Sequence, residues 1–180
     1  MAGQSPAAQA LTVSWTHTAS RMRIPIPGTW ELLLSEIPGA AVIPWATRAL
    51  ELGFDGPCLR ELAGHDESAA WSDLETPFRG ALREVGLPAN PSQVLIRRSY
   101  ARDVAEAVLD GRILPGDAAD RMELHVLSPL SHPADLQPWC HLQDHRHPDD
   151  YREISDTERD QLIGSEARRL LEEEGKHSAS

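Results

Sequence analysis

The chain has 180 residues, 41% of them hydrophobic, and its 28 Asp and Glu against 17 Lys and Arg give a formal net charge of -11. A chain of this length can bury one sizeable core. The sequence contains no run of roughly 20 apolar residues that could cross a bilayer. The negative charge disfavours binding to nucleic acid and to anionic lipid surfaces, so we expect a soluble protein without either kind of partner.

The start of the chain and its cysteines indicate the compartment. Residues 1–11 lack the basic and apolar regions of a secretory signal, so export is not expected. Cys58 and Cys140 are the only cysteines, and a chain of this size does not need a disulfide scaffold. We therefore expect reduced thiols and a cytoplasmic protein. Lys176 is the sole lysine among many arginines and alanines, which is typical of a GC-rich bacterial genome.

The first 28 residues are predicted to be a flexible N-terminal segment. They are mainly small and polar up to Arg21, and Pro25 and Pro27 favour extended backbone. Because every strong helix signal lies downstream, the start of translation stays open between Met1 and Met22.

Capping residues, prolines and glycines then predict four short helices. The expected helices run from 29 to 37, from 44 to 52, between Asp55 and Gly64, and from 76 to 86. Thr29 and Asp55 are the expected N-caps of the first and third helices. Leu33 and Ile37 are expected one turn apart on the first.

The clearest helix signal lies at 91–110, where Asn90 precedes Pro91 and Gly111 follows the last turn. Apolar residues line one side of this helix, and charged residues at four-residue steps line the other, which predicts a solvated face. After a short turn, the segment 117–127 is expected to be helical again.

Residues 128–150 contain four prolines and four histidines, so we expect an ordered loop with one helical turn. Ser155 and Glu158 form a capping box for a final helix that ends at Glu174, followed by a flexible tail at 175–180. The sequence therefore predicts an all-α fold, a single compact domain of about six or seven short helices over 29–174, with a His/Pro-rich loop before the last helix.

One stretch carries a resemblance to known proteins. Residues 100–120 (YARDVAEAVLDGRILPGDAAD) resemble a pattern of small, uncharacterised bacterial helical proteins, in which an Ala-rich helix ends in Gly and an Ile/Pro turn leads into a second helix. Residues 144–171 are similar to the close of those proteins. Asp117 and Ala118 stand where that pattern has Gly and Ala. The resemblance implies a helical fold, and it assigns no activity and no functional residue.

The segment 140–147 is the one chemically suggestive cluster, because Cys140, His141 and His145 are residue types that bind zinc. His141 and His145 would share a face if the segment were helical. Leu142 stands where a zinc peptidase would have its general-base Glu, so peptidase chemistry is not supported. A solvated or interface-forming loop is favoured, and no metal or cofactor is expected. Zinc is the open alternative.

Nucleophilic catalysis has little support in the sequence. Cys140 would need a base such as His132 or His125 brought close by the fold. Cys58 lies between apolar neighbours and is expected to be a small buried side chain. Neither a Gly-x-Ser-x-Gly motif nor a Gly-rich phosphate loop occurs. We expect a protein that is not an enzyme.

The aromatic residues indicate where a partner could bind. Trp30 and Trp45 are expected in the core, whereas Trp71 and Trp139 are left open between the core and a contact surface.

A protein partner, possibly basic, is expected to contact Trp139, Asp149, Asp150 and Tyr151, next to the acidic start of the last helix. The predicted function is a non-enzymatic protein-interaction protein, such as a bacterial immunity or defence-accessory protein. The alternative is a metal-binding protein or metal-dependent enzyme that uses the loop 140–147.

Overall fold

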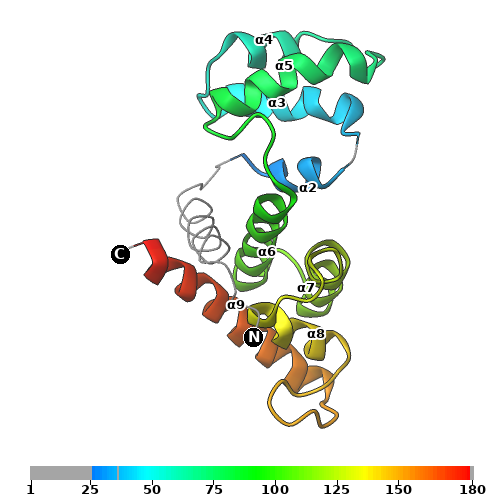
Figure 1. Ribbon diagram of the computed structural model, residues 1–180, viewed down its shortest axis with the longest axis vertical. Helices are drawn as coiled ribbons and strands as arrows, with labels where there is room; N and C mark the ends of the chain where they lie inside the picture. Colours follow the sequence, from blue (N-terminus) through cyan, green and yellow to red (C-terminus); the bar gives the residue numbers. More distant parts are fainter. Residues whose placement is uncertain (1–25, 36, 179–180) are drawn as a thin grey trace, which may run out of the picture. The chain divides into compact units, whose positions relative to one another are not determined.

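The computed structural model describes residues 26–35 and 37–178, with the side chains described up to Glu173 (Figure 1). The expectations for residues 1–25, including the choice between Met1 and Met22, lie outside the described residues. The described chain is all-α, as predicted: it is built of helices and contains no β-strand. No helix in this part of the chain has the length and apolar composition needed to span a membrane.

Contacts between residues divide the described chain into two compact units, at Ile96 and Arg97. The division falls within one helix, α6 (Gln93–Leu109), inside the range 29–174 that the sequence predicts as one domain. We describe each unit by itself, as the first unit (residues 26–96) and the second unit (residues 97–178).

The first unit contains four α-helices before α6. They are α2 (Thr29–Leu34), α3 (Val42–Glu51), α4 (Pro57–Ala63) and α5 (Trp71–Glu84), with a 3-10 turn, η1 (Gly39–Ala41), before α3. Helix α4 packs against both α3 and α5. The core is formed by the buried side chains of Ile26, Trp30, Val42, Trp45, Leu59, Leu62, Leu74, Phe78 and Leu82.

Two tryptophans of the first unit lie where the sequence predicts them. Trp30 and Trp45 are both buried. The indole nitrogen of Trp45 donates a 2.9 Å hydrogen bond to the hydroxyl of Thr29, which itself donates to the carbonyl of Ile26. The hydroxyl of Thr29 therefore satisfies a buried indole N–H, a group that costs free energy when it is left unpaired.

Helix α5 begins five residues earlier than predicted, at Trp71, and contains Pro77 in its interior. The ring of Trp71 meets that of Phe78 edge-on at 5.9 Å, so the aromatic contact joins the added turn to the core. Such tertiary packing overrides the local preference of proline for the first turn. Helix α2 ends at Leu34, short of the predicted end at Ile37, and the side chain of Ile37 is exposed.

The N-terminus of α4 is capped from a distance, whereas the sequence predicts Asp55 as its cap. The carboxylate of Glu84, at the end of α5, accepts hydrogen bonds from the backbone N–H groups of Cys58 and Leu59. Asp55 instead pairs with Arg60. Farther along α5, Gly80 lies so close to α4 that a β-carbon there would overlap the sulfur of Cys58.

The second unit contains the C-terminal part of α6 and the remaining helices. These are α7 (Pro115–Met122), the π-helical segment η2 (Glu123–Leu127), two 3-10 turns, η3 (Ser128–Leu130) and η4 (Ala134–Leu136), then α8 (Gln137–Gln143) and α9 (Asp156–Ser178). Helices α7, α8 and α9 pack against one another. The buried side chains of the second unit include Met122, Val126, Leu127, Leu136, Trp139, Leu142, Ile163 and Ala167.

One residue, Asp135, joins three elements of the second unit. Asp135, in η4, accepts two hydrogen bonds from the guanidinium of Arg98 on α6, and its backbone carbonyl accepts a third from Arg169 on α9. The pKa of Asp135 lies below its usual value of 3.8, mainly because Arg98 donates these hydrogen bonds.

The last helix begins as predicted, because Ser155 accepts a hydrogen bond from the N–H of Glu158. Its backbone continues to Ser178, past the predicted end at Glu174. A glycine such as Gly175 inside a helix costs only about 1 kcal/mol relative to alanine, so it need not end one.

Candidate functional site

Helix α8 and the loop after it contain most of the side chains that the sequence singles out. The expected loop is partly helical, since α8 forms two turns with Pro138 in the first. Trp139 and Leu142, three residues apart on this helix, both point into the core, and Trp139 is 0% exposed. The prediction that Trp139 contacts a partner is therefore wrong, because the helix directs its ring inward.

His141 and His145 do not form a pair. Helix α8 ends at Gln143, and His145 has a left-handed backbone with a φ of 55°, so the two side chains do not share a helix face. The ring of His141 meets that of Tyr151 at 4.6 Å. The Nδ1 atom of His145 lies 3.5 Å from a carboxylate oxygen of Asp156.

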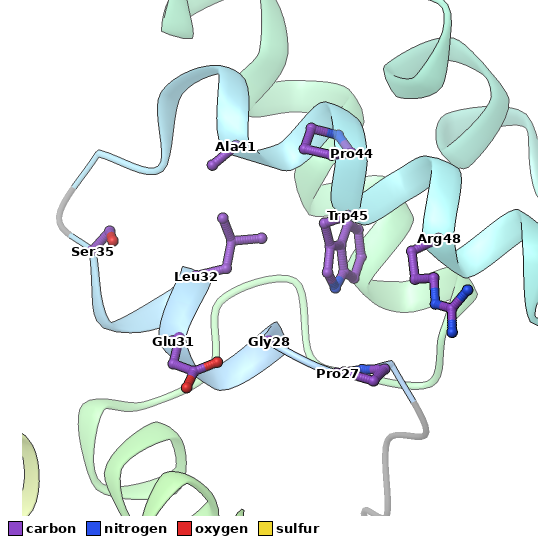
Figure 2. A pocket seen from close by; sticks show the side chains of 9 residues that line it. All are labelled: Pro27, Gly28, Glu31, Leu32, Ser35, Ala41, Pro44, Trp45 and Arg48. Carbon is purple, nitrogen blue, oxygen red and sulfur yellow. The ribbon is translucent and has the colours of Figure 1, made fainter. Parts of the chain in front are cut away.

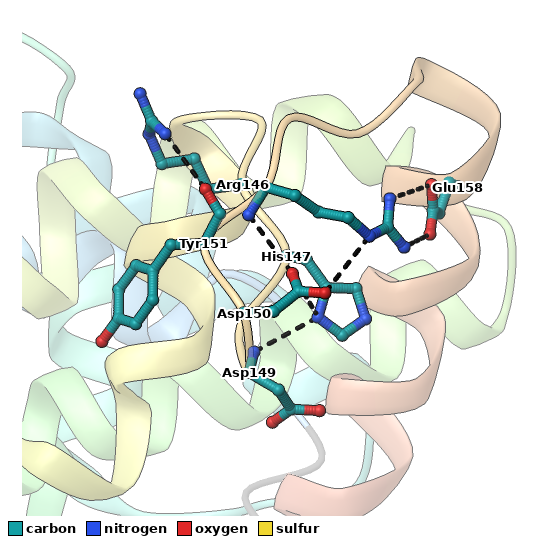
Figure 3. Close-up of polar contacts among 7 residues, drawn as sticks. Arg146, His147, Asp149, Asp150, Tyr151 and Glu158 are labelled. Atoms are coloured by element: carbon teal, nitrogen blue, oxygen red, sulfur yellow. Dashed lines mark hydrogen bonds and ion pairs between the residues drawn. The ribbon is translucent and has the colours of Figure 1, made fainter.

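A hairpin-like loop follows and is held by backbone hydrogen bonds. The N–H of His147 donates to the carbonyl of Arg152 at 2.9 Å, and the N–H of Ile154 donates to the carbonyl of His145 at 3.0 Å. The guanidinium of Arg146 donates to the carbonyl of Tyr151 (Figure 3). We call residues 146–156 the acidic loop.

An ion pair joins the acidic loop to α9. The guanidinium of Arg152 donates two hydrogen bonds to the carboxylate of Glu158 (Figure 3). The pKa of Glu158 is lowered mainly by these hydrogen bonds. This carboxylate is therefore ionised at neutral pH. Because both groups are largely exposed to solvent, the ion pair stabilises the loop only modestly.

The acidic loop exposes an aromatic ring among carboxylates. Tyr151 is 58% exposed, with a left-handed backbone at a φ of 58°. Asp149, Asp150 and Asp156 are also exposed. Between residues 146 and 160 the chain carries six carboxylates and three arginines, so the surface is negative.

A second cluster lies elsewhere in the second unit. Glu123, His132 and Cys140 bring a carboxylate oxygen, an imidazole nitrogen and a sulfur within 4.8 Å of one another. His132 is thus near Cys140, as the hypothesis of a Cys/His pair requires, whereas His125 packs against the ring of Tyr100. The sequence carries no sign that Glu123 belongs to this cluster, since its spacing from Cys140 does not indicate contact.

The environment of Cys140 favours the thiol over the thiolate. Burial raises the pKa of Cys140, and the nearby carboxylates of Glu123 and Asp144 raise it further. An activated nucleophilic cysteine has a lowered pKa instead. The arrangement is therefore unsuited to a free thiolate nucleophile at neutral pH.

The first unit contains a pocket of about 480 Å³ between α2 and α3 (Figure 2). It is lined by Pro27, Gly28, Glu31, Leu32, Ser35, Ala41, Pro44, Trp45 and Arg48. Arg48 forms an ion pair with Glu51. The lining combines apolar side chains with the charged side chains of Glu31 and Arg48.

Comparisons with protein families, curated proteins and solved structures find no match for this chain. The resemblance of residues 100–120 to small bacterial helical proteins therefore stays a prediction.

Proposed function

We propose that this protein is a non-enzymatic interaction protein and that its acidic loop binds a basic region of another protein. The observation that carries the proposal is Tyr151, which is 58% exposed on a hydrogen-bonded turn next to Asp149 and Asp150. A bacterial immunity or defence-accessory protein that neutralises a basic toxin is the concrete form of this proposal.

The fixed backbone of the loop supports binding. The hydrogen bonds between His147 and Arg152 and between Arg146 and Tyr151 hold the turn that presents the aromatic ring. Contact with His141 limits the freedom of the Tyr151 ring itself. A side chain that is already ordered loses less conformational entropy when a partner binds. Tyrosine is also common among the residues that dominate binding energy in protein interfaces.

The charges of the loop support a basic partner. Asp149, Asp150 and Asp156 are exposed carboxylates near the Tyr151 turn, and the whole chain has a net charge of -11. Such a surface attracts a cationic partner and raises its association rate most at low ionic strength.

The two cysteines support a non-enzymatic function. Burial raises the pKa of Cys58 as well as that of Cys140, and the carboxylate of Glu84 adds to the effect at Cys58. Both thiols therefore stay protonated at neutral pH, which is opposite to the state of a catalytic cysteine.

The test begins with a photo-crosslinking residue placed at position 151 of the full-length protein in its native host. The matched control carries the same residue at position 114, because Leu114 is 70% exposed in the same unit and lies outside the acidic loop. A protein captured at position 151 and not at 114 is then purified for binding measurements.

For that partner, Tyr151→Ala should weaken binding by about 2 kcal/mol if the ring is a central contact. Asp149→Lys with Asp150→Lys should mainly slow association and reduce its salt dependence. Leu114→Ala should leave binding unchanged. Wild-type affinity in both loop variants would place the contact surface elsewhere and contradict the proposal.

A further inference from the structure

The inference concerns Glu123, His132 and Cys140, which come from three different elements of the second unit. Glu123 is the first residue of the π-helical segment η2, His132 follows the 3-10 turn η3, and Cys140 lies in α8. Single π-helical turns within helices are frequent at functional sites. These three side chains take no part in the acidic loop, so the inference is independent of the proposed function.

The turn after η3 returns the chain toward Glu123. Ser131 and His132 both have positive φ angles, 58° and 51°, which non-glycine residues seldom adopt. The N–H of His132 donates to the carbonyl of Leu127 at 2.8 Å and fixes this turn. As a result, Nε2 of His132 lies 3.1 Å from a carboxylate oxygen of Glu123.

The second carboxylate oxygen of Glu123 is the feature that the surrounding residues leave unexplained. This oxygen, Oε2, is buried and has no hydrogen-bond partner among the described residues. A buried carboxylate oxygen without a partner is costly, and a bound cation is one way to compensate it. The sulfur of Cys140 and the imidazole of His132 supply two further electron-pair donors beside it.

We propose that Glu123, His132 and Cys140 bind one zinc ion. In a tetrahedral zinc site with bonds of 2.0–2.3 Å, neighbouring ligand atoms lie about 3.3–3.8 Å apart. The three donor atoms already lie within 4.8 Å of one another, so small side-chain rotations bring them to these separations. Three protein ligands leave a fourth position for water or for a donor group of another molecule.

The donor types favour zinc over the hard cations. Magnesium and calcium prefer oxygen ligands, whereas thiolate and imidazole together select zinc and related transition metals. Cys140 would bind as the thiolate and transfer its proton to solvent. The side chains of His132 and Glu123 are 41% and 28% exposed, so a metal ion can reach them from solvent.

This site differs from the zinc site that the sequence leaves open as an alternative within the loop 140–147. It retains Cys140 and replaces His141 and His145 with Glu123 and His132. His141 contacts Tyr151 and His145 lies beside Asp156, so both serve the acidic loop.

The test is a titration of the purified full-length protein with cobalt(II) chloride, because a cobalt–thiolate bond gives an intense near-ultraviolet absorption. We expect this absorption to saturate at one cobalt per chain and to be reversed by zinc chloride. Cys140→Ser should abolish it. His132→Gln and Glu123→Gln should each weaken cobalt binding at least about tenfold.

The matched controls are Cys58→Ser for the other thiol and His141→Gln for the neighbouring imidazole, and both should bind cobalt as the wild type does. Circular dichroism confirms that each variant is folded, and the wild-type titration is decisive without any variant. Absence of the thiolate absorption in the wild type overturns the proposal. So does an absorption that persists in Cys140→Ser, or one that depends on His141 and not on His132.

Discussion

The carboxylate of Glu84 fills the space in which a side chain at Gly56 would lie. A β-carbon at Gly56 would overlap this carboxylate, which caps α4 through the N–H groups of Cys58 and Leu59. The backbone at Gly56 is extended, with a φ of -161°, so any residue could adopt its conformation. The requirement for glycine therefore comes from the cap and not from the backbone.

Gly56→Ala should displace Glu84 and leave two backbone N–H groups without a partner, at a cost of about 1–3 kcal/mol in the free energy of unfolding. Urea denaturation measures this cost. The control is Gly64→Ala, where a β-carbon would meet the carbonyl oxygens of Arg60 and Glu61 at 3.4 and 3.5 Å. In a Glu84→Ala background, Gly56→Ala should cost much less, because the overlap is gone. Equal costs in both backgrounds would contradict the account.

Asp135 should make the second unit sensitive to acid. Its pKa in the folded protein is lowered by Arg98, so its contribution is fully present above the usual value of 3.8 and is lost as the pH falls through the lower folded value. The melting temperature of the wild type should therefore fall below about pH 4 more steeply than that of Asp135→Asn. Arg98→Gln should flatten the profile in the same way. Parallel profiles for all three proteins would show that the pair has no linkage to pH.

Trp139→Ala should test the core position of this side chain. Removing a fully buried tryptophan costs about 3–5 kcal/mol, whereas removing the exposed ring of Tyr151 should change stability by only about 0.5 kcal/mol. Urea denaturation of the two variants compares them directly. Similar stability losses would mean that Trp139 is not in the core.

Local signals in the sequence predict much of the fold. Pro57 lies in the first turn of α4 and Ser155 caps α9, because proline and capping preferences act between neighbouring residues. Ile163 and Ala167, four residues apart on α9, both lie in the core. All of these features depend on residues within a few positions of each other.

Features formed by distant residues could not be predicted in this way. The cap of α4 comes from Glu84, 26 residues beyond Cys58, and local patterns carry no sign of it. The Glu123 cluster depends on the left-handed turn at His132, a conformation that histidine seldom adopts. Four prolines around Trp139 indicate a loop and so favour a contact with a partner, whereas Pro138 lies in the first turn of a short helix.

The positions of the two cysteines give the molecule an internal reporter of local opening. Cys58 lies in the first unit against Gly80, and Cys140 lies in the second unit, each partly buried and outside any disulfide. A thiol-modifying reagent needs each thiol to become accessible, so the two labelling rates follow the opening of each unit separately. Zinc at the proposed site would slow the labelling of Cys140 and leave that of Cys58 unchanged. Mass spectrometry can measure the labelling rate of each cysteine, so the rate at Cys140 would report metal occupancy.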